Sequence, residues 1–257
     1  MTDTLITPPQ KSFKILLIGD YCIDEYRFGT VDRISPEAPV PIFKETRRIT
    51  TEGMVGNVYQ NFHKLGCWVD LYKGGNSLKT RLIDEKSKQH ILRLDNDDYA
   101  SELKYEHILR EEIVHADAIV ISDYNKGYVS YKLVKKLRDE YDGPIFIDTK
   151  KTDLLRFQGC FVKINELEFN AAQTFCKDII VTRGSYYVQY KNHLFDVPNV
   201  DVFDVCGAGD TFLAALTYGY LSYGSIEKAI PFAIKAASIT VQNLGVYAPT
   251  LKEINET

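Results

Sequence analysis

Short apolar runs that are rich in β-branched residues recur along the chain. They lie at Lys14–Ile18, Ala118–Ser122, Pro144–Ile147, Phe161–Ile164 and Ile179–Thr182. Between several of them, stretches such as Ser130–Glu140 and Glu102–Val114 carry apolar residues at helical spacing. Strands that alternate with helices are typical of a mostly parallel sheet covered on both faces, so the pattern predicts an α/β fold. In such a sheet, ligands bind beyond the carboxyl ends of the strands.

Two segments, Tyr26–Thr50 and Lys79–Asp95, show a different pattern, in which polar and apolar residues alternate. Alternation is typical of strands that expose one face to water. We therefore expect these segments to form a small second sheet beside the main one. A plain surface hairpin would show the same periodicity.

The length and charge of the chain narrow the classes of partner. Its 257 residues are enough for one α/β domain with a core, and 45% hydrophobic and 26% charged residues are usual for a globular protein. A formal net charge of −4 gives no reason to expect nucleic acid or an anionic membrane as a partner. The longest apolar runs, such as Ile15–Ile18, are far shorter than a bilayer span.

The cysteines and the first residues indicate the compartment. The five cysteines are widely scattered and include no CxxC pair, which predicts reduced thiols and neither a zinc site nor a disulfide framework. Met1–Lys11 has no apolar segment like that of a signal peptide. We therefore expect a cytoplasmic protein that acts on small molecules.

The stretch Asp204–Phe212 carries the most specific chemistry. It follows a strand-like apolar segment and leads directly into a helical pattern. The nearly bare backbone N–H groups of Gly207, Ala208 and Gly209 lie where the helix dipole favours an anion. Asp210 follows on the first turn, where it can take a proton from a hydroxyl that attacks a phosphoryl group held by the loop. The alternative is an ordinary glycine turn before a helix.

This stretch resembles the C-terminal signature Asp-x-x-Gly-Ala-Gly-Asp of the ribokinase-like (PfkB-type) sugar kinases. The resemblance implies a ribokinase-like three-layer sandwich with a mostly parallel sheet and a small β lid, formed by residues 1–257 as one domain. It also implies ATP and Mg²⁺ as cofactors, and a lid built from Tyr26–Thr50 and Lys79–Asp95. In this family the lid covers the substrate and often forms the contact of a homodimer, which we expect here.

Arg33–Pro41, with three prolines, closely resembles one subfamily, the D-glycero-β-D-manno-heptose-7-phosphate kinases of lipopolysaccharide heptose synthesis. The resemblance implies phosphoryl transfer from ATP to the anomeric hydroxyl of heptose 7-phosphate, which gives the 1,7-bisphosphate. The nucleotidyltransferase domain often fused to these kinases is expected to be absent. Prolines that fix an extended chain are also a purely structural device.

Several residues match the sugar-binding motifs of the family. By position, Asp24 corresponds to the sugar-binding aspartate, whereas Asp20 is equally suited to cap a turn. Gly53 and Asn57 occupy the place of the Gly-Gly-x-x-Asn motif, in which Met54 replaces the second glycine. Asn57 would bind sugar hydroxyls, or it would cap the helix predicted over Val58–Leu65.

Two further motifs match the binding of a phosphorylated sugar. Lys79 and Arg81 resemble a Thr-Lys-x-Arg strand that reaches the phosphate of the substrate, although any exposed strand carries such charges. Asp123 and Lys126 match the turn Asp-Tyr-Gly-Lys-Gly and would orient sugar and phosphate, as surface residues of a turn also could. Asn125 replaces the first glycine of this turn and tolerates the left-handed conformation.

The nucleotide side is implied by three strand-end motifs. Lys150 follows Asp148-Thr149 and would face the nucleotide phosphates. Asn165 and Glu168 fit the Asn-x-x-Glu motif that holds magnesium largely through water, and they equally fit a helix N-cap with an acidic first turn. Thr182 and Gly184 match a Thr-x-Gly segment near the ATP phosphates.

The resemblance extends over roughly Lys14–Thr250 but includes two deletions. Relatives carry a further helix and strand between the positions of Cys67 and Lys79, where we expect only a short strand and a Gly74-Gly75 turn. The region between Glu168 and Ile179 is cut to about one short helix. Two alternatives to a heptose 7-phosphate kinase therefore stay open: a kinase for another phosphosugar or a nucleoside, and a non-catalytic descendant that binds nucleotide or sugar.

Overall fold

A computed structural model describes residues 12–243 and 245–256 of the chain. The predicted absence of a signal segment in Met1–Lys11 concerns residues outside this range. The strands form one sheet in the order β10-β9-β8-β7-β6-β5-β1-β3-β4, and β2 pairs with β1. The parallel strands are β1 (Lys14–Ile34), β3 (Trp68–Asp84), β5 (Ala118–Asp123), β6 (Ile145–Thr149), β7 (Phe161–Asn165) and β8 (Ile179–Thr182). All five runs predicted as strands are therefore confirmed.

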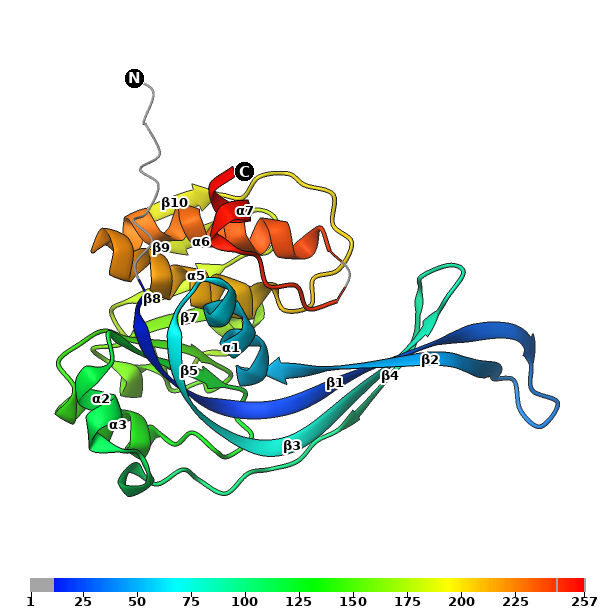
Figure 1. Cartoon of the computed structure of the whole chain (residues 1–257), viewed down its shortest axis with the longest axis horizontal. Coiled ribbons are helices and arrows are strands. Elements are labelled where there is room, and N and C mark those ends of the chain that lie inside the picture. Colours follow the sequence, from blue (N-terminus) through cyan, green and yellow to red (C-terminus); the bar gives the residue numbers. More distant parts are fainter. Residues whose placement is uncertain (1–11, 244, 257) are drawn as a thin grey trace.

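Helices cover both faces of this sheet, which gives the predicted three layers (Figure 1). On one side lie α1 (Val55–Lys64), α5 (Ala208–Tyr223), α6 (Ile226–Val241) and α7 (Leu251–Glu256). On the other side lie α2 (Arg110–His115), α3 (Tyr131–Glu140) and the short turns η1 (Tyr105–His107) and η2 (Leu154–Phe157). Alternate residues of β1 divide between the two cores: Ile15 and Leu17 pack in the first, and Leu16 and Ile18 in the second. This division is what a sheet buried on both faces requires.

The lid is continuous with the main sheet and is not the separate sheet that we expected. It consists of β2 (Pro41–Met54), β4 (His90–Asn96) and the second halves of β1 and β3, and it projects from the helical layers as a long ribbon (Figure 1). Up to Gly19, β1 pairs with β5; from Tyr21 onward, it pairs with β2 instead. One strand thus joins the core to the lid.

The predicted Gly74-Gly75 turn is wrong, because both glycines lie inside β3. The pairing of β1 with β3 shifts between Asp20 and Cys22, opposite Gly74 and Ser77, so β3 carries one extra residue there. Gly75 has a φ of 90°, which a glycine adopts without steric cost. The extra residue forms a bulge, which bends a strand without ending it.

Two smaller expectations also differ from the structure. The stretch Glu102–Val114 forms only η1 and the six-residue helix α2, which an extended segment separates. The helix expected over Val58–Leu65 begins earlier, at Val55.

The single short helix expected after Glu168 is found as α4 (Glu166–Ala171). The sheet ends in the antiparallel strands β9 (Tyr187–Tyr190) and β10 (His193–Asp196).

Helix α5 is positioned by close contact with α6. A Cβ atom at Gly219 would lie 3.1 Å from both the Cα and the Cβ of Ala229, so the two helices meet there with no room for a larger side chain. Gly224, in the left-handed conformation, ends α5 and begins the tight turn into α6. Residues Asp210–Gly219 of α5 are buried, and the first turn of the helix faces the site described below.

We predict that Gly219→Val lowers the stability of the fold by about 1–3 kcal/mol, because the added methyl groups must push α6 away. Ser222→Ala on the same helix is the control; its hydroxyl bonds to the carbonyl of Tyr218 one turn earlier, so its removal is expected to change stability by less than about 0.5 kcal/mol. Urea unfolding followed by circular dichroism measures both changes. Equal stability of the two variants would contradict the close contact.

Candidate active site

The first turn of α5 brings the predicted anion loop and Asp210 to the carboxyl edge of the sheet. Gly207 is the N-cap residue and has a φ of 79°, in the left-handed region that favours glycine. A Cβ atom at Gly207 would also lie 2.6 Å from Nδ2 of Asn57, so the loop can approach α1 only with a glycine there. The left-handed backbone and the close contact with Asn57 both require a glycine at position 207, as in the family signature.

Asp210 is only 6% exposed, and two side chains from other elements hold its carboxylate. Asn57 on α1 donates to Oδ2 at 2.9 Å, and the hydroxyl of Tyr124 donates to Oδ1 at 3.2 Å. Burial raises the pKa of Asp210 to about 6, and the bond from Asn57 opposes that rise. The carboxylate is therefore ionised at neutral pH but close enough to its pKa to accept a proton.

Asn57 is not the helix cap that we considered. Helix α1 begins at Val55 with Met54 as its N-cap residue, which makes no capping bond, so Asn57 lies within the first turn and points at Asp210. Met54 has a φ of 54°, which means that it adopts the glycine-like backbone of the motif position that it occupies.

Asp24 and Arg81 are brought together on neighbouring strands of the lid. Both side chains are buried, and the guanidinium of Arg81 donates to Oδ1 of Asp24. A Cβ atom at Gly53 would lie 2.0 Å from Oδ2 of Asp24, so the glycine makes room for this carboxylate. The structure thus places these three predicted sugar-site residues in one cluster.

The thiol of Cys22 lies within the lid cluster, where it donates to Oδ2 of Asp24 at 3.8 Å. Burial, followed by the charge of Asp24, raises the pKa of this thiol to about 12. The ammonium of Lys79 lies 5.2 Å from the ring centre of Tyr124, whose hydroxyl contacts Asp210.

Asp123 lies in a buried network and not on the surface of the site. Its carboxylate accepts from the hydroxyl of Thr149 at 2.7 Å, from Lys151 Nζ at 2.8 Å and from the backbone N–H of Asn125. Asn125 has a φ of 58°, so the predicted left-handed conformation is confirmed. This network gives Asp123 a role in fixing the turn that carries Tyr124.

The same turn is tied to β1 by Asp20, which lies within the strand and does not cap the local turn that we considered. Its carboxylate accepts from the backbone N–H groups of Lys126 and Tyr128 at 3.1 and 3.3 Å. The side chain of Lys126 pairs with Asp97, which follows β4, at 2.5 Å. Lys126 is thus anchored by its backbone and carries its charge toward the lid.

Asn165 and Glu168 form a reciprocal capping box at the start of α4. Oδ1 of Asn165 accepts from the Glu168 N–H at 2.9 Å, and Glu168 Oε2 accepts from the Asn165 N–H at 2.7 Å. The remaining oxygen of Glu168 accepts from the ammonium of Lys150, which brings these two predicted nucleotide-site residues together. Among the described residues, no group of three or more His, Cys, Asp or Glu side chains is arranged to hold a metal ion.

Sequence reasoning missed a buried ion pair beneath the anion loop. Lys163 on β7 donates to Oδ2 of Asp148 at 2.7 Å, and both side chains are buried. A Cβ atom at Gly209 would lie only 2.9 Å from Lys163 Nζ. The available signal was a lysine within an apolar parallel strand, where a charge is rarely found without a partner.

A cavity of about 450 Å³ extends from the anion loop along α5 and α6. Thr182 and Gly184 line it at the end of β8, and Ala208 and Gly209 line it at the start of α5. Its other walls are mostly apolar, from residues such as Val188, Val202 and Phe212. An apolar cavity of this size that opens on an anion loop suits a ring system joined to phosphates.

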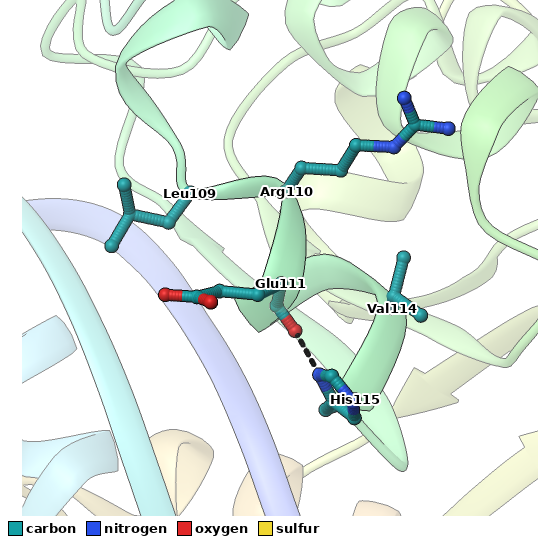
Figure 2. A pocket seen from close by; sticks show the side chains of 5 residues that line it. All are labelled: Leu109, Arg110, Glu111, Val114 and His115. Carbon is teal, nitrogen blue, oxygen red and sulfur yellow. Dashed lines mark hydrogen bonds between the residues drawn. The ribbon is translucent and has the colours of Figure 1, made fainter.

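A second hollow, of about 460 Å³, lies far from this chemistry on the outer surface of α2 (Figure 2). Arg110 and Val114, one turn apart, extend from the same side of the short helix, and His115 contacts the carbonyl of Glu111 at 2.7 Å. It contains none of the predicted site residues. We therefore place the candidate site at Asp210 and not at this hollow.

Solved structures of known kinases share the fold. Ribokinase from Thermotoga maritima superposes with a TM-score of 0.71 at 18% identity, over 95% of this chain and 98% of that one. Phosphofructokinase-2 from Escherichia coli, in complex with potassium, gives a TM-score of 0.72 at 15% identity, over 96% of this chain and 98% of that one. These likenesses establish a ribokinase-like α/β fold. Every helix among the described residues is too short or too polar to cross a membrane.

Curated relatives are more similar in sequence. The bifunctional protein HldE of Hyphomonas neptunium is 31% identical over 303 residues, covering 94% of this chain and 62% of the relative. HldE of Nitratiruptor sp. is 28% identical over 298 residues, covering 95% of this chain and 64% of the relative. The chain thus spans less than two thirds of the length of these relatives. Both alignments are longer than the chain itself, so the relatives contain segments that this chain lacks.

The sequence pattern of the pfkB family carbohydrate kinases matches residues 162–253. This range contains the capping box, the anion loop and Asp210, together with helices α5 and α6 that position them. The family pattern, the fold and the HldE relatives agree: residues 162–253 carry the pattern of the pfkB family carbohydrate kinases within a ribokinase-like fold.

Proposed function

We propose that the protein is an ATP-dependent kinase that phosphorylates a hydroxyl of a sugar phosphate, with the anomeric hydroxyl of heptose 7-phosphate as the acceptor. The family match and the ribokinase-like fold support an ATP-dependent carbohydrate kinase. The observation that carries the proposal is the position of Asp210, a buried carboxylate with a pKa of about 6 on the first turn of the helix that bears the anion loop.

Asp210 acts as the general base in the proposed reaction. The acceptor oxygen forms a bond to the γ-phosphorus while the bond from that phosphorus to the bridging oxygen breaks, and ADP leaves with the bonding electrons. The hydroxyl proton passes to Asp210, whose Oδ1 accepts, from the residues that the structure describes, the single 3.2 Å bond from Tyr124. Asn57 keeps the other oxygen in place, so the carboxylate has one defined face for the acceptor.

The start of α5 stabilises the charge on the transferring group. Gly207 caps α5, and Ala208 and Gly209 begin its first turn, so their backbone N–H groups have no carbonyl partner within the helix; the N–H of Ala208 makes a long bond of 3.4 Å to the carbonyl of Val205. A phosphoryl group there is favoured by the helix dipole and by these donors. The cavity lined by Thr182 and Gly184 would hold the nucleoside.

Magnesium fits this site as an ion that arrives with the nucleotide. Glu168 and Asp148 supply carboxylates near the loop, but each is engaged by a lysine, Lys150 or Lys163. Because magnesium keeps several waters and needs few protein ligands, Asn165 and Glu168 would hold it largely through water. When bound, the ion neutralises the nucleotide phosphates.

The lid cluster would bind the sugar phosphate. Asp24, buried beside Arg81, has carboxylate oxygens suited to sugar hydroxyls. Arg81, Lys79 and Lys126 supply the positive charge that a phosphate on the acceptor requires. The choice of heptose 7-phosphate rests on Arg33–Pro41 and on relatives that share the name HldE.

We also propose that two chains associate through their lids. On the face of the lid turned away from Asp24 and Arg81, the paired strands carry Ile23, Leu78, Leu82, Leu92 and Leu94. Leu92 and Leu94 are 48% and 53% exposed. A ribbon of strands with an exposed apolar face and open edges gains stability by pairing with a second copy.

The proposed function is tested by an ATP-consumption screen of the purified protein against sugars and sugar phosphates. We predict turnover with heptose 7-phosphate and a loss of about 10²–10⁴-fold in Asp210→Asn, since a general base contributes that much. The control is Asp139→Asn on the exposed side of α3, which is expected to keep full turnover. Full turnover by Asp210→Asn would rule out its role as the base. Nucleotide binding without turnover on any acceptor would favour a non-catalytic descendant.

The pKa of Asp210 predicts the pH dependence of the reaction. A base with a pKa of about 6 is ionised above that pH, so kcat/KM should be constant at pH 7–8 and fall about tenfold per unit below pH 6. Substrate phosphates also ionise near pH 6, and Asn57→Ala separates the two effects. Loss of the Asn57 bond raises the pKa of Asp210, so the acid limb of that variant should move to higher pH. An unmoved limb would assign it to the substrate.

Light scattering tests the proposed dimer. We predict about twice the chain mass for the wild type at micromolar concentration and one chain mass for the variant Leu92→Asp with Leu94→Asp, because charges on that face disfavour its burial. Leu155→Asp on η2 is equally exposed but remote from the lid, and it should leave the dimer intact. A monomeric wild type would contradict this proposal.

A further inference from the structure

Lys163 is a buried charge in the middle of an apolar strand. It lies on β7 between Val162 and Ile164, and it is 4% exposed. Burying an ammonium costs free energy that a single ion pair does not always repay. Its pairing with Asp148 at 2.7 Å explains how the charge is tolerated but not why the strand carries one.

The ammonium lies at the start of α5. Nζ is 2.9 Å from where a Cβ atom of Gly209 would be, and Asp148 Oδ2 is 3.9 Å from the same point. A cation at the positive end of a 16-residue helix is unfavourable by itself. The arrangement becomes favourable when an anion lies between the ammonium and the helix, since both then attract it.

The ammonium of Lys163 can donate further hydrogen bonds to such an anion. An ammonium has three N–H donors, and within residues 12–243 and 245–256 Lys163 donates to Asp148 alone. Lys150, by contrast, is more exposed and pairs with Glu168 at the rim.

We propose that Lys163 is a catalytic residue whose ammonium donates a hydrogen bond to the transferring phosphoryl group, with Asp148 holding it in position. The inference rests on the proposed function and deepens it. Lys163 keeps its proton and forms no covalent bond in this step. The γ-phosphorus passes from the bridging oxygen of ATP to the acceptor oxygen, the proton of the acceptor hydroxyl goes to Asp210, and ADP keeps the electron pair. A compact point charge is suited to follow an oxygen during this transfer.

The test compares Lys163→Met with the double variant Asp148→Asn/Lys163→Met, which leaves no buried carboxylate unpaired. We expect Lys163→Met to lower kcat by about 10²–10³-fold, as for the loss of one donor to a developing charge. We also expect the ratio of the affinities for MgATP and MgADP to be about 10–100-fold lower in Lys163→Met than in the wild type, as for the loss of one hydrogen bond from a charged donor. The double variant should recover the melting temperature but not kcat. Lys135→Met on the exposed face of α3 is the control.

Two results would overturn the proposal. One is wild-type kcat and nucleotide preference in Lys163→Met; the other is recovery of kcat together with the melting temperature in the double variant, which would mean that Lys163 only balances Asp148. If none of the tested acceptors supports ATP consumption by the wild type, the proposed function fails. Equilibrium binding of MgATP and MgADP then still tests whether Lys163 contacts the transferring phosphoryl group. A reduced preference for MgATP in Lys163→Met then supports the phosphoryl contact, whereas an unchanged preference, or no nucleotide binding by the wild type, overturns it.

Discussion

The burial of Asp210 is the constraint on which the rest of the site depends. A carboxylate with almost no exposure must be hydrogen-bonded, and its two donors come from α1 and from the turn after β5. Three elements that are distant in sequence are therefore fixed around one side chain. The same burial costs stability when the group is ionised, which the contact of α5 with α6 must offset. The raised pKa and the exact approach of the helices are two consequences of placing a charge where water is excluded.

The continuity of β1 links the lid to the base. Because one strand pairs with β5 at its start and with β2 further on, the lid cluster has a fixed backbone connection to the core sheet. Asp20 strengthens this junction by accepting hydrogen bonds from the turn that carries Tyr124. The bulge at Gly75 bends β3 at the same level. Strand β3 runs without interruption from Trp68 to Asp84, so the residues at the site keep their connection.

Local patterns in the sequence were sufficient for the five apolar strands, for the helix that begins after Gly207 and for the left-handed conformation of Asn125, because each depends on neighbours in the chain. The contact between Asn57 and Asp210 was not accessible in this way, since the two residues are 153 positions apart and meet only when α1 packs against α5. The pair of Asp24 with Arg81 is likewise set by strand register. Gly74-Gly75 was misread because two glycines suit a turn and a bulge equally. Lys163 was overlooked because its role depends on the burial of its side chain, which the pattern of a strand indicates only indirectly.

The lysines of the site share one electrostatic arrangement. Lys126, Lys150 and Lys163 each pair with a carboxylate, respectively Asp97, Glu168 and Asp148. Without such partners, cations gathered around one region would repel each other and the site would be costly to form. A phosphate that enters the region competes with these carboxylates for the same donors, which the ion pairs already hold in place. The pairs therefore reconcile two requirements, a stable protein in the absence of substrate and a set of cations already aimed at phosphate.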